Sequence, residues 1–212
     1  MTTLSWTEEA SSAIVELRND ANLEADFVIC TVSNPKKSPE MVLASPDHAG
    51  RGGRDKIEAI LASGDVDDQV MTGAFLATAI DERGSVVSTR RKYIHVLWVG
   101  PSVGVMVKGK VNSMSGAFRD KFPGCALYLQ LMGDLDDIKE AKLETDLLAC
   151  GGAHKPTRYD FSNKTLVASS TPSSSPVKAP APAPEPEAAG EEEEAEPEPA
   201  AAEEEAAAEE EE

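Results

Sequence analysis

The sequence has few cysteines, no long apolar run and no leader-like start. Its three cysteines, Cys30, Cys125 and Cys150, are widely spaced and form no C-x-x-C pair, which is typical of free thiols in a reducing compartment. No apolar run approaches the roughly 20 residues that a membrane-spanning helix needs. The start, "MTTLSWTEEASS", has neither the basic region nor the apolar core of a signal peptide. These absences predict a soluble intracellular protein.

Basic residues are nearly missing from the C-terminal part of the chain. The 212 residues carry a net charge of -18, but the 44 residues from Ser169 onward hold 15 Glu and a single Lys. Residues 1–168 hold 23 acidic and 19 basic residues, a net charge of -4. The acidic character therefore belongs to the tail and not to the body.

The tail, residues 169–212, also lacks aromatic residues and has one Val as its only apolar residue besides Ala and Pro. Such a segment buries too little apolar surface to offset the entropy of ordering, so we predict a disordered Pro/Ala/Ser spacer followed by a polyglutamate stretch. The body, residues 1–168, suits one domain, which would bury about 70% of the surface of its unfolded chain.

Apolar periodicity in the body predicts helices and strands in the order α, β-β, α, β-β, α, β, α. This is an α/β (α+β) fold in which a mixed sheet of about five strands is sandwiched between helices. The predicted helices span residues 5–20, 55–64, 111–122 and 134–150, and the predicted strands span residues 25–34, 40–45, 73–80, 90–100 and 125–133.

Local signals refine three of these elements. Ser5 and Glu8 fit a capping box, with Trp6 on the apolar face of the helix that follows. The segment "DHAGRGGR" reads as a mobile loop, and Gly64 as the C-terminal cap of the next helix. In the strand at residues 90–100, Tyr93 and His95 should point to one face and Ile94 to the other, with His95 a satisfied core histidine.

A cluster of cations stands at the entrance of that strand, in "STRRKYIHVLWVG" at residues 88–100. Arg90, Arg91 and Lys92 are consecutive, although the chain as a whole is acidic. Two interpretations are open from the residues alone: a docking surface for a negatively charged partner, or an ordinary solvated hairpin end.

Three segments carry a resemblance to a known family: "STRRKYIHVLWVG", then "VGVMVKGKVNSMSGAFRDKF", then "LETDLLACGGAHKPTRYDF". Together they resemble the coactosin branch of the actin-depolymerising-factor homology family, over about residues 4–161. The resemblance implies the fold of that family and binding along filamentous actin. It also implies stabilising filaments or opposing their capping, without severing them.

In that family the lysine that ends the basic stretch is the residue most tied to filament binding, and here it is Lys92. The following helix and its approach supply further contacts, so the resemblance implies that the actin-binding residues are Arg90, Arg91, Lys92, Lys108, Lys110, Arg119 and Lys121. Acidic phosphoinositides would compete at the same cations. No cofactor is implied, and we expect a monomer of the cytoplasm and cytoskeleton.

Other classes of function find little support. Cys150 and His154 are only two of the four ligands that a zinc site typically needs, so we predict no metal. "GRGGR" lacks the strand-to-helix frame of a phosphate-binding loop, and we predict no nucleic-acid partner. No nucleophile elbow, paired-carboxylate motif or kinase signature is present, so we predict that the protein is not an enzyme.

The tail itself suggests an alternative function and a mode of regulation. Polyglutamate tails occur on chaperones of basic proteins such as histones, where charge gives salt-sensitive binding. A tethered polyanion also leads to the hypothesis that the tail screens Lys92 and its neighbours and competes with actin at low salt.

Overall fold

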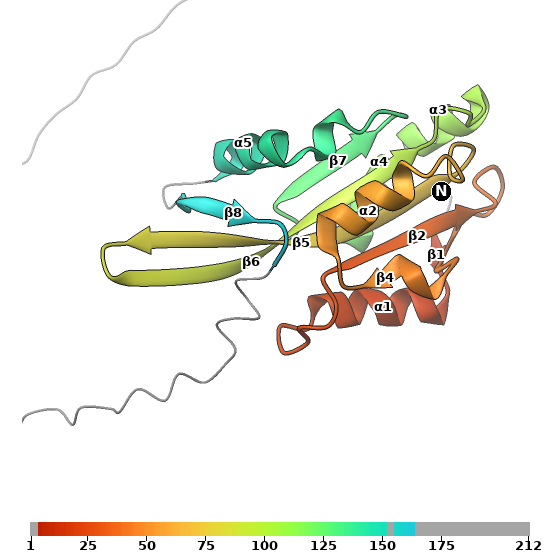
Figure 1. Ribbon diagram of the computed structural model, residues 1–212. Coiled ribbons are helices and arrows are strands. Elements are labelled where there is room, and N and C mark those ends of the chain that lie inside the picture. The colour runs from red at the N-terminus through yellow and green to blue at the C-terminus, as the bar shows by residue number, and fades with distance from the viewer. Residues whose placement is uncertain (1–3, 152–154, 164–212) are drawn as a thin grey trace, which may run out of the picture. The chain divides into compact units, whose positions relative to one another are not determined.

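The structure of the protein, a computed structural model, describes residues 4–151 and 155–163. In these residues a mixed sheet of eight strands runs in the order β1-β3-β2-β5-β6-β7, with β4 paired to β2 and β8 paired to β5 (Figure 1). The strands are β1 Ser5–Trp6, β2 Phe27–Ser33, β3 Glu40–Val42, β4 Ala49–Gly50, β5 Val70–Arg83, β6 Val86–Val99, β7 Leu127–Leu131 and β8 Arg158–Asp160.

Helices cover both faces of this sheet. They are α1 Glu8–Arg18, α2 Gly53–Leu61, α3 Val105–Ser113, α4 Ser115–Lys121 and α5 Glu140–Cys150, with 3-10 turns η1 Pro46–His48 and η2 Asp136–Ile138. One apolar cluster joins α1, α3 and α4 to one face of the sheet, and a second joins α2 and α5 to the other face. The predicted α+β class is confirmed: its five strands are present as β2, β3, β5, β6 and β7, and β1, β4 and β8 are short additions.

The β5–β6 hairpin is the longest element pair, with register from Val70 opposite Val99 to Arg83 opposite Val86. Its two faces divide as the alternation predicts, because Leu97 and Val99 belong to the α1 side and Ile94, Val96 and Trp98 to the α5 side. Figure 1 shows the hairpin tip reaching past the helices. The part of β6 that leads to this tip carries the basic stretch.

The predicted capping box at the first helix is wrong. Thr7 is the N-cap, and its side chain accepts a hydrogen bond from the backbone N–H of Ala10. Ser5 and Trp6 form β1 instead, where the Ser5 N–H donates to the carbonyl of Pro39. Pairing with a distant strand thus fixes the two residues before the helix, while the predicted helix end is confirmed by the C-cap at Asn19.

The single helix predicted for residues 111–122 is wrong at its start and in its continuity. It begins at Val105, and the chain forms two helices, α3 and α4, that meet at Met114. Met114 and Phe118 are nevertheless buried as the helical spacing predicts. Gly116, whose helix propensity is about 1 kcal/mol poorer than that of Ala, lies just after the break.

The loop predicted at residues 47–54 is also more ordered than its sequence indicates. It contains the end of η1, strand β4 and the start of α2. Gly52 has φ 126° and Gly53 has φ 48°, conformations that a β-carbon disfavours, and the Gly53 N–H donates to Asp26 Oδ1 at 2.7 Å. The glycines serve this turn, and α2 itself ends before Gly64, at the C-cap Ala62.

Two expectations fall on the C-terminal part of the chain. The domain boundary at residue 168 and the tail, residues 169–212, lie outside the described residues and stay predictions. Within the described ranges, no helix is long and apolar enough to cross a membrane.

Candidate functional site

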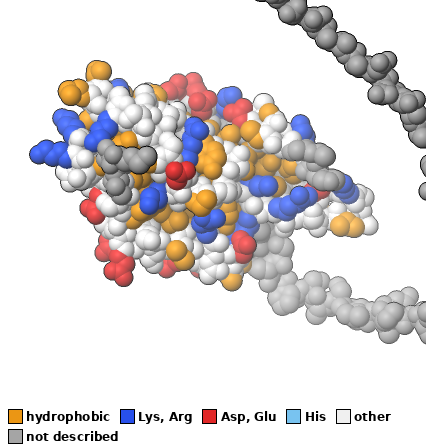
Figure 2. Space-filling model, turned by 180° about the vertical axis from the view of Figure 1, so that it is seen from behind, with side chains coloured by type: hydrophobic (Ala, Val, Ile, Leu, Met, Phe, Trp, Pro, Cys, Tyr) orange, Lys and Arg blue, Asp and Glu red, His pale blue; other side chains and the backbone are white. Residues whose placement is uncertain are grey.

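The seven predicted actin-binding residues lie on three elements and do not form one continuous ridge. Arg90, Arg91 and Lys92 are on β6, the half-buried Lys108 and Lys110 are on α3, and Arg119 and Lys121 are on α4. Figure 2 shows Lys and Arg side chains spread over several places along one side of the molecule. The contacts of each side chain decide which of them are available to a partner.

Arg90 and Lys92 point to the same face of the sheet and line a pocket of about 230 Å³ with Leu147, Cys150 and Tyr159. Among the described residues this part of β6 is an edge, because β7 pairs with β6 only from Ile94 onward. Arg90 lies 3.5 Å from Asp81 Oδ2, and its side chain is 52% exposed.

The half-buried Lys92 has no hydrogen-bond, ion-pair or ring partner among residues 4–151 and 155–163. Each of the other six cations has at least one such partner. A cation that no group of the described residues neutralises, at the edge of a strand, is available for an acidic partner.

Arg91 points to the opposite face and is committed to the fold. Its guanidinium donates to the carbonyls of Leu17 at 3.3 Å, Asn19 at 3.2 Å and Asn22 at 3.5 Å, and its side chain is 10% exposed. These are carbonyls at and just beyond the end of α1, where a cation is favoured by the helix dipole. Arg91 therefore stabilises the end of α1, and its guanidinium is not available to a partner protein.

Lys108 and Lys110 each donate a hydrogen bond from Nζ to a backbone carbonyl outside α3. Lys108 Nζ donates to Pro101 O at 3.0 Å, and Lys110 Nζ donates to Lys36 O at 2.8 Å. The second bond brings Lys36 and Lys37, both exposed, next to Lys110. These two lysines are cations that sequence reasoning missed, because the loop that carries them is more than 70 residues away in the chain.

The first turn of α3 presents two apolar side chains to solvent, Val105 at 85% and Met106 at 87% exposed. Both were missed in the sequence, where "VGVMVKGK" gives no sign that these residues face outward. Large apolar side chains this exposed, beside cations, are typical of a contact surface for another protein.

Arg119 and Lys121 lie over aromatic rings. The Arg119 guanidinium is 5.4 Å from the centre of the Tyr128 ring, and Lys121 Nζ is 6.0 Å from that of Trp6. Such contacts contribute about 0.5–1 kcal/mol at exposed sites and leave the cation accessible. They fix the two side chains on the outer side of α4.

Beneath Arg119 lies His95, which is 1% exposed, as a core histidine should be. Its Nε2 is 3.0 Å from the Thr72 hydroxyl, and its ring contacts Phe122 and Tyr128. Burial, with a smaller contribution from the charge of Arg119, lowers the pKa of His95 to about 4.

This burial predicts a pH-dependent loss of stability. The unfolded chain binds the His95 proton near pH 6.5 and the folded chain only near pH 4, so stability falls as pH drops below 6.5. Between pH 7.5 and 5.0 the His95 contribution to the free energy of unfolding should fall by about 2 kcal/mol. Urea unfolding of the wild type and of His95→Gln at both pH values measures it; equal pH slopes would contradict it.

The cysteines are free thiols: Cys30 is buried, Cys125 half-buried and Cys150 exposed. Burial raises the pKa of Cys30 to about 12 and that of Cys125 to about 11, so neither is an activated nucleophile. No group of three potential ligands that could hold a metal ion occurs in the described ranges, and His154 lies outside them.

The model of the family described as cofilin/tropomyosin-type actin-binding protein matches residues 3–148. The chain belongs to this family. The predicted resemblance is thereby confirmed at the level of the family, and actin is the partner that the family implies. The family match gives no support to the alternative of a chaperone for basic proteins.

Two solved coactosin structures share the fold of this cofilin-family chain. Coactosin from Entamoeba histolytica is 20% identical with a TM-score of 0.56, and the match covers 71% of this chain and 98% of that one. Human coactosin-like protein is 19% identical with a TM-score of 0.51, over 73% of this chain and 94% of that one. No curated protein sequence matches the chain.

Proposed function

We propose that this protein binds along actin filaments and stabilises them or opposes their capping, without severing them. The proposal rests most on Lys92, whose ammonium has no partner in the described part of the chain and lies at the open edge of β6. Arg90, on the same face, extends the positive charge toward the hairpin tip.

The proposed contact surface has two parts: this edge, on the α5 face of the sheet, and the outer side of α3 and α4, which cover the other face. It comprises Arg90, Lys92, Lys108, Lys110, Arg119 and Lys121, to which the structure leads us to add Lys36, Lys37, Val105 and Met106. Cations speed association with an acidic filament and set its register, while the two apolar side chains bury area on binding. Arg91 supports the surface indirectly by holding the end of α1.

Two measurements on one preparation test the proposal. In co-sedimentation, the full chain is expected to pellet with filaments in proportion to the filament concentration. In images of labelled filaments, the chain should leave filament length unchanged or greater. Filaments that shorten after addition of the chain would overturn the non-severing role, and a chain that stays in the supernatant at low salt would overturn filament binding.

The tail is expected to weaken filament binding through its charge. Ending the chain at Ala168 changes the net charge from -18 to -4 and leaves the cations of the surface unchanged. The truncated chain should therefore pellet more strongly at low ionic strength. The difference should shrink as salt rises, because the Debye length is about 8 Å at physiological ionic strength. Equal affinities at every salt concentration would contradict this role of the tail.

Three further properties follow from the same proposal. Vesicles containing acidic phosphoinositides should compete with filaments, since their headgroups pair with the same cations. The protein should be a monomer, and it should be found in the cytoplasm with the actin cytoskeleton. Loss of competition in Lys92→Ala would place the lipid headgroups on the proposed surface.

A further inference from the structure

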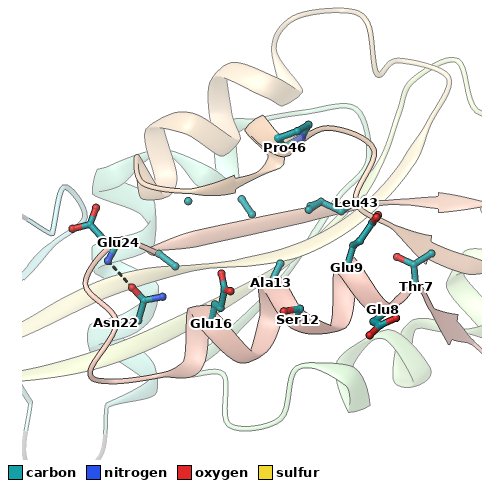
Figure 3. A pocket seen from close by; sticks show the side chains of 13 residues that line it. Thr7, Glu8, Glu9, Ser12, Ala13, Glu16, Asn22, Glu24, Leu43 and Pro46 are labelled. Atoms are coloured by element: carbon teal, nitrogen blue, oxygen red, sulfur yellow. Dashed lines mark hydrogen bonds between the residues drawn. The ribbon is translucent and has the colours of Figure 1, made fainter.

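A wide groove of the described domain lies away from the proposed actin-binding residues. It is a groove of about 770 Å³ between α1 and the segment that carries β3, η1 and β4, and none of the seven predicted residues lines it. Figure 3 shows Glu9, Ala13 and Glu16 pointing from α1 toward Leu43 and Pro46 on the opposite wall.

The groove has an apolar floor and an acidic rim. The apolar residues that line the floor and the wall opposite α1 are Ala13, Ala25, Leu43, Pro46 and Ala49. The rim carries Glu9 and Glu16 from α1, with Glu24 at the far end, where its backbone N–H donates to Asn22 Oδ1 at 2.9 Å (Figure 3). No Lys or Arg is among the lining residues.

The rim charge is largely unneutralised within the described part of the chain. Arg51 lies 3.6 Å from Glu24, but Glu9 and Glu16 have no ion-pair partner among residues 4–151 and 155–163. No group of three His, Cys, Asp or Glu side chains that could hold a metal ion occurs in these residues. A ligand with two separate cationic side chains could pair with Glu9 and Glu16, one cation on each carboxylate.

The spacing of the carboxylates indicates the form of that ligand. Glu9 and Glu16 are seven residues apart on α1, roughly 10 Å at 1.5 Å per residue. In a polyproline-type extended segment, residues three positions apart lie on the same side and roughly 9 Å apart. Two basic residues with this separation would each reach one carboxylate, and a small apolar side chain between them would lie on the floor.

We propose that this groove binds a basic, extended peptide segment of a partner protein, with cations three positions apart on Glu9 and Glu16. Charge complementarity selects this occupant, because the rim presents hydrogen-bond acceptors of one charge sign above an apolar floor. The groove and the proposed actin-binding residues share no side chain, so both partners would bind the same molecule.

Binding of labelled ten-residue peptides to the full chain, followed by fluorescence anisotropy, tests the proposal. One peptide carries two arginines three positions apart among Ala, Val and Pro, and a second has the same composition with adjacent arginines. The first should bind more tightly. Glu9→Gln with Glu16→Gln should weaken its binding about fivefold or more. Ser12→Trp, which fills the groove and keeps every charge, should do the same.

The polyglutamate tail is present in every variant, so its own attraction for the peptide cancels in the comparison. Asp137→Asn with Glu140→Gln makes the same charge change near α5 and should leave binding within about twofold. Equal effects of the groove and control variants, or no effect of Ser12→Trp, would overturn the proposal. Self-association of the wild type that Ser12→Trp abolishes would also overturn it, because a second copy would then cover the groove.

Filament co-sedimentation of the groove variants separates this proposal from the proposed function. Ser12→Trp should pellet with actin as the wild type does, while losing the peptide. If the groove variants lose both, the groove belongs to the filament contact and the proposal of a separate peptide site fails.

Discussion

Arg91→Ala is expected to lower the free energy of unfolding by about 2–3 kcal/mol, the largest stability effect among the cations of the basic stretch. The substitution removes three hydrogen bonds from a charged donor to carbonyls at and just beyond the end of α1. It also removes the contact of the guanidinium with the Tyr93 ring, 5.8 Å from its centre. Urea unfolding of the wild type and the variant measures the difference.

The neighbouring Arg90→Ala is the matched control. Its side chain is 52% exposed and, in the part of the chain that the structure describes, pairs with Asp81 alone, so its removal should cost less than about 1 kcal/mol. Similar losses in the two variants would contradict the distinction between a structural Arg91 and an available Arg90.

Val105→Asp with Met106→Asp is expected to reduce filament affinity about tenfold or more, with no loss of stability. The two side chains are the most exposed large apolar groups of the described residues, and burying them would supply much of the contact energy. Carboxylates in the first turn of α3 are favoured by the helix dipole, so the variant should stay folded.

Val15→Asp is the control for this variant, since Val15 is 67% exposed on α1. It should pellet with filaments as the wild type does. Undiminished pelleting of the α3 variant would remove Val105 and Met106 from the contact surface.

The main helices and strands could be predicted because their signals are local. The spacing of Ala10, Ala13, Ile14 and Leu17 predicts the buried face of α1, and all four are buried. The alternation along β6 predicts which side chains reach each face, and the two apolar clusters follow it. Periodicity is informative here because each element packs along most of its length.

The failures come from long-range pairing and from short elements. Ser5 looks like a helix cap until β3 is placed beside it, and β8, three residues long, is too short for a periodic signal. Gly73 illustrates the same limit: a β-carbon there would lie 2.1 Å from the Val28 carbonyl oxygen, a close approach of two strands that are 45 residues apart.

The candidate site was predictable as a set of charges but not as a surface. Three consecutive cations on a strand must alternate between faces, so Arg91 was separable from Arg90 and Lys92 in principle. What could not be predicted was that the end of α1 lies beside Arg91, or that Lys36 and Lys37 lie beside Lys110. These neighbours come from tertiary packing, which no local pattern contains.

The most direct test of the account is co-sedimentation of Lys92→Ala with actin filaments at physiological ionic strength. Lys56→Ala, the same charge change on the exposed side of α2, is the matched control. We expect pelleting to be lost or weakened about tenfold in Lys92→Ala and kept in Lys56→Ala, with both variants as stable as the wild type. Wild-type pelleting by Lys92→Ala would contradict a filament contact at the open edge of β6.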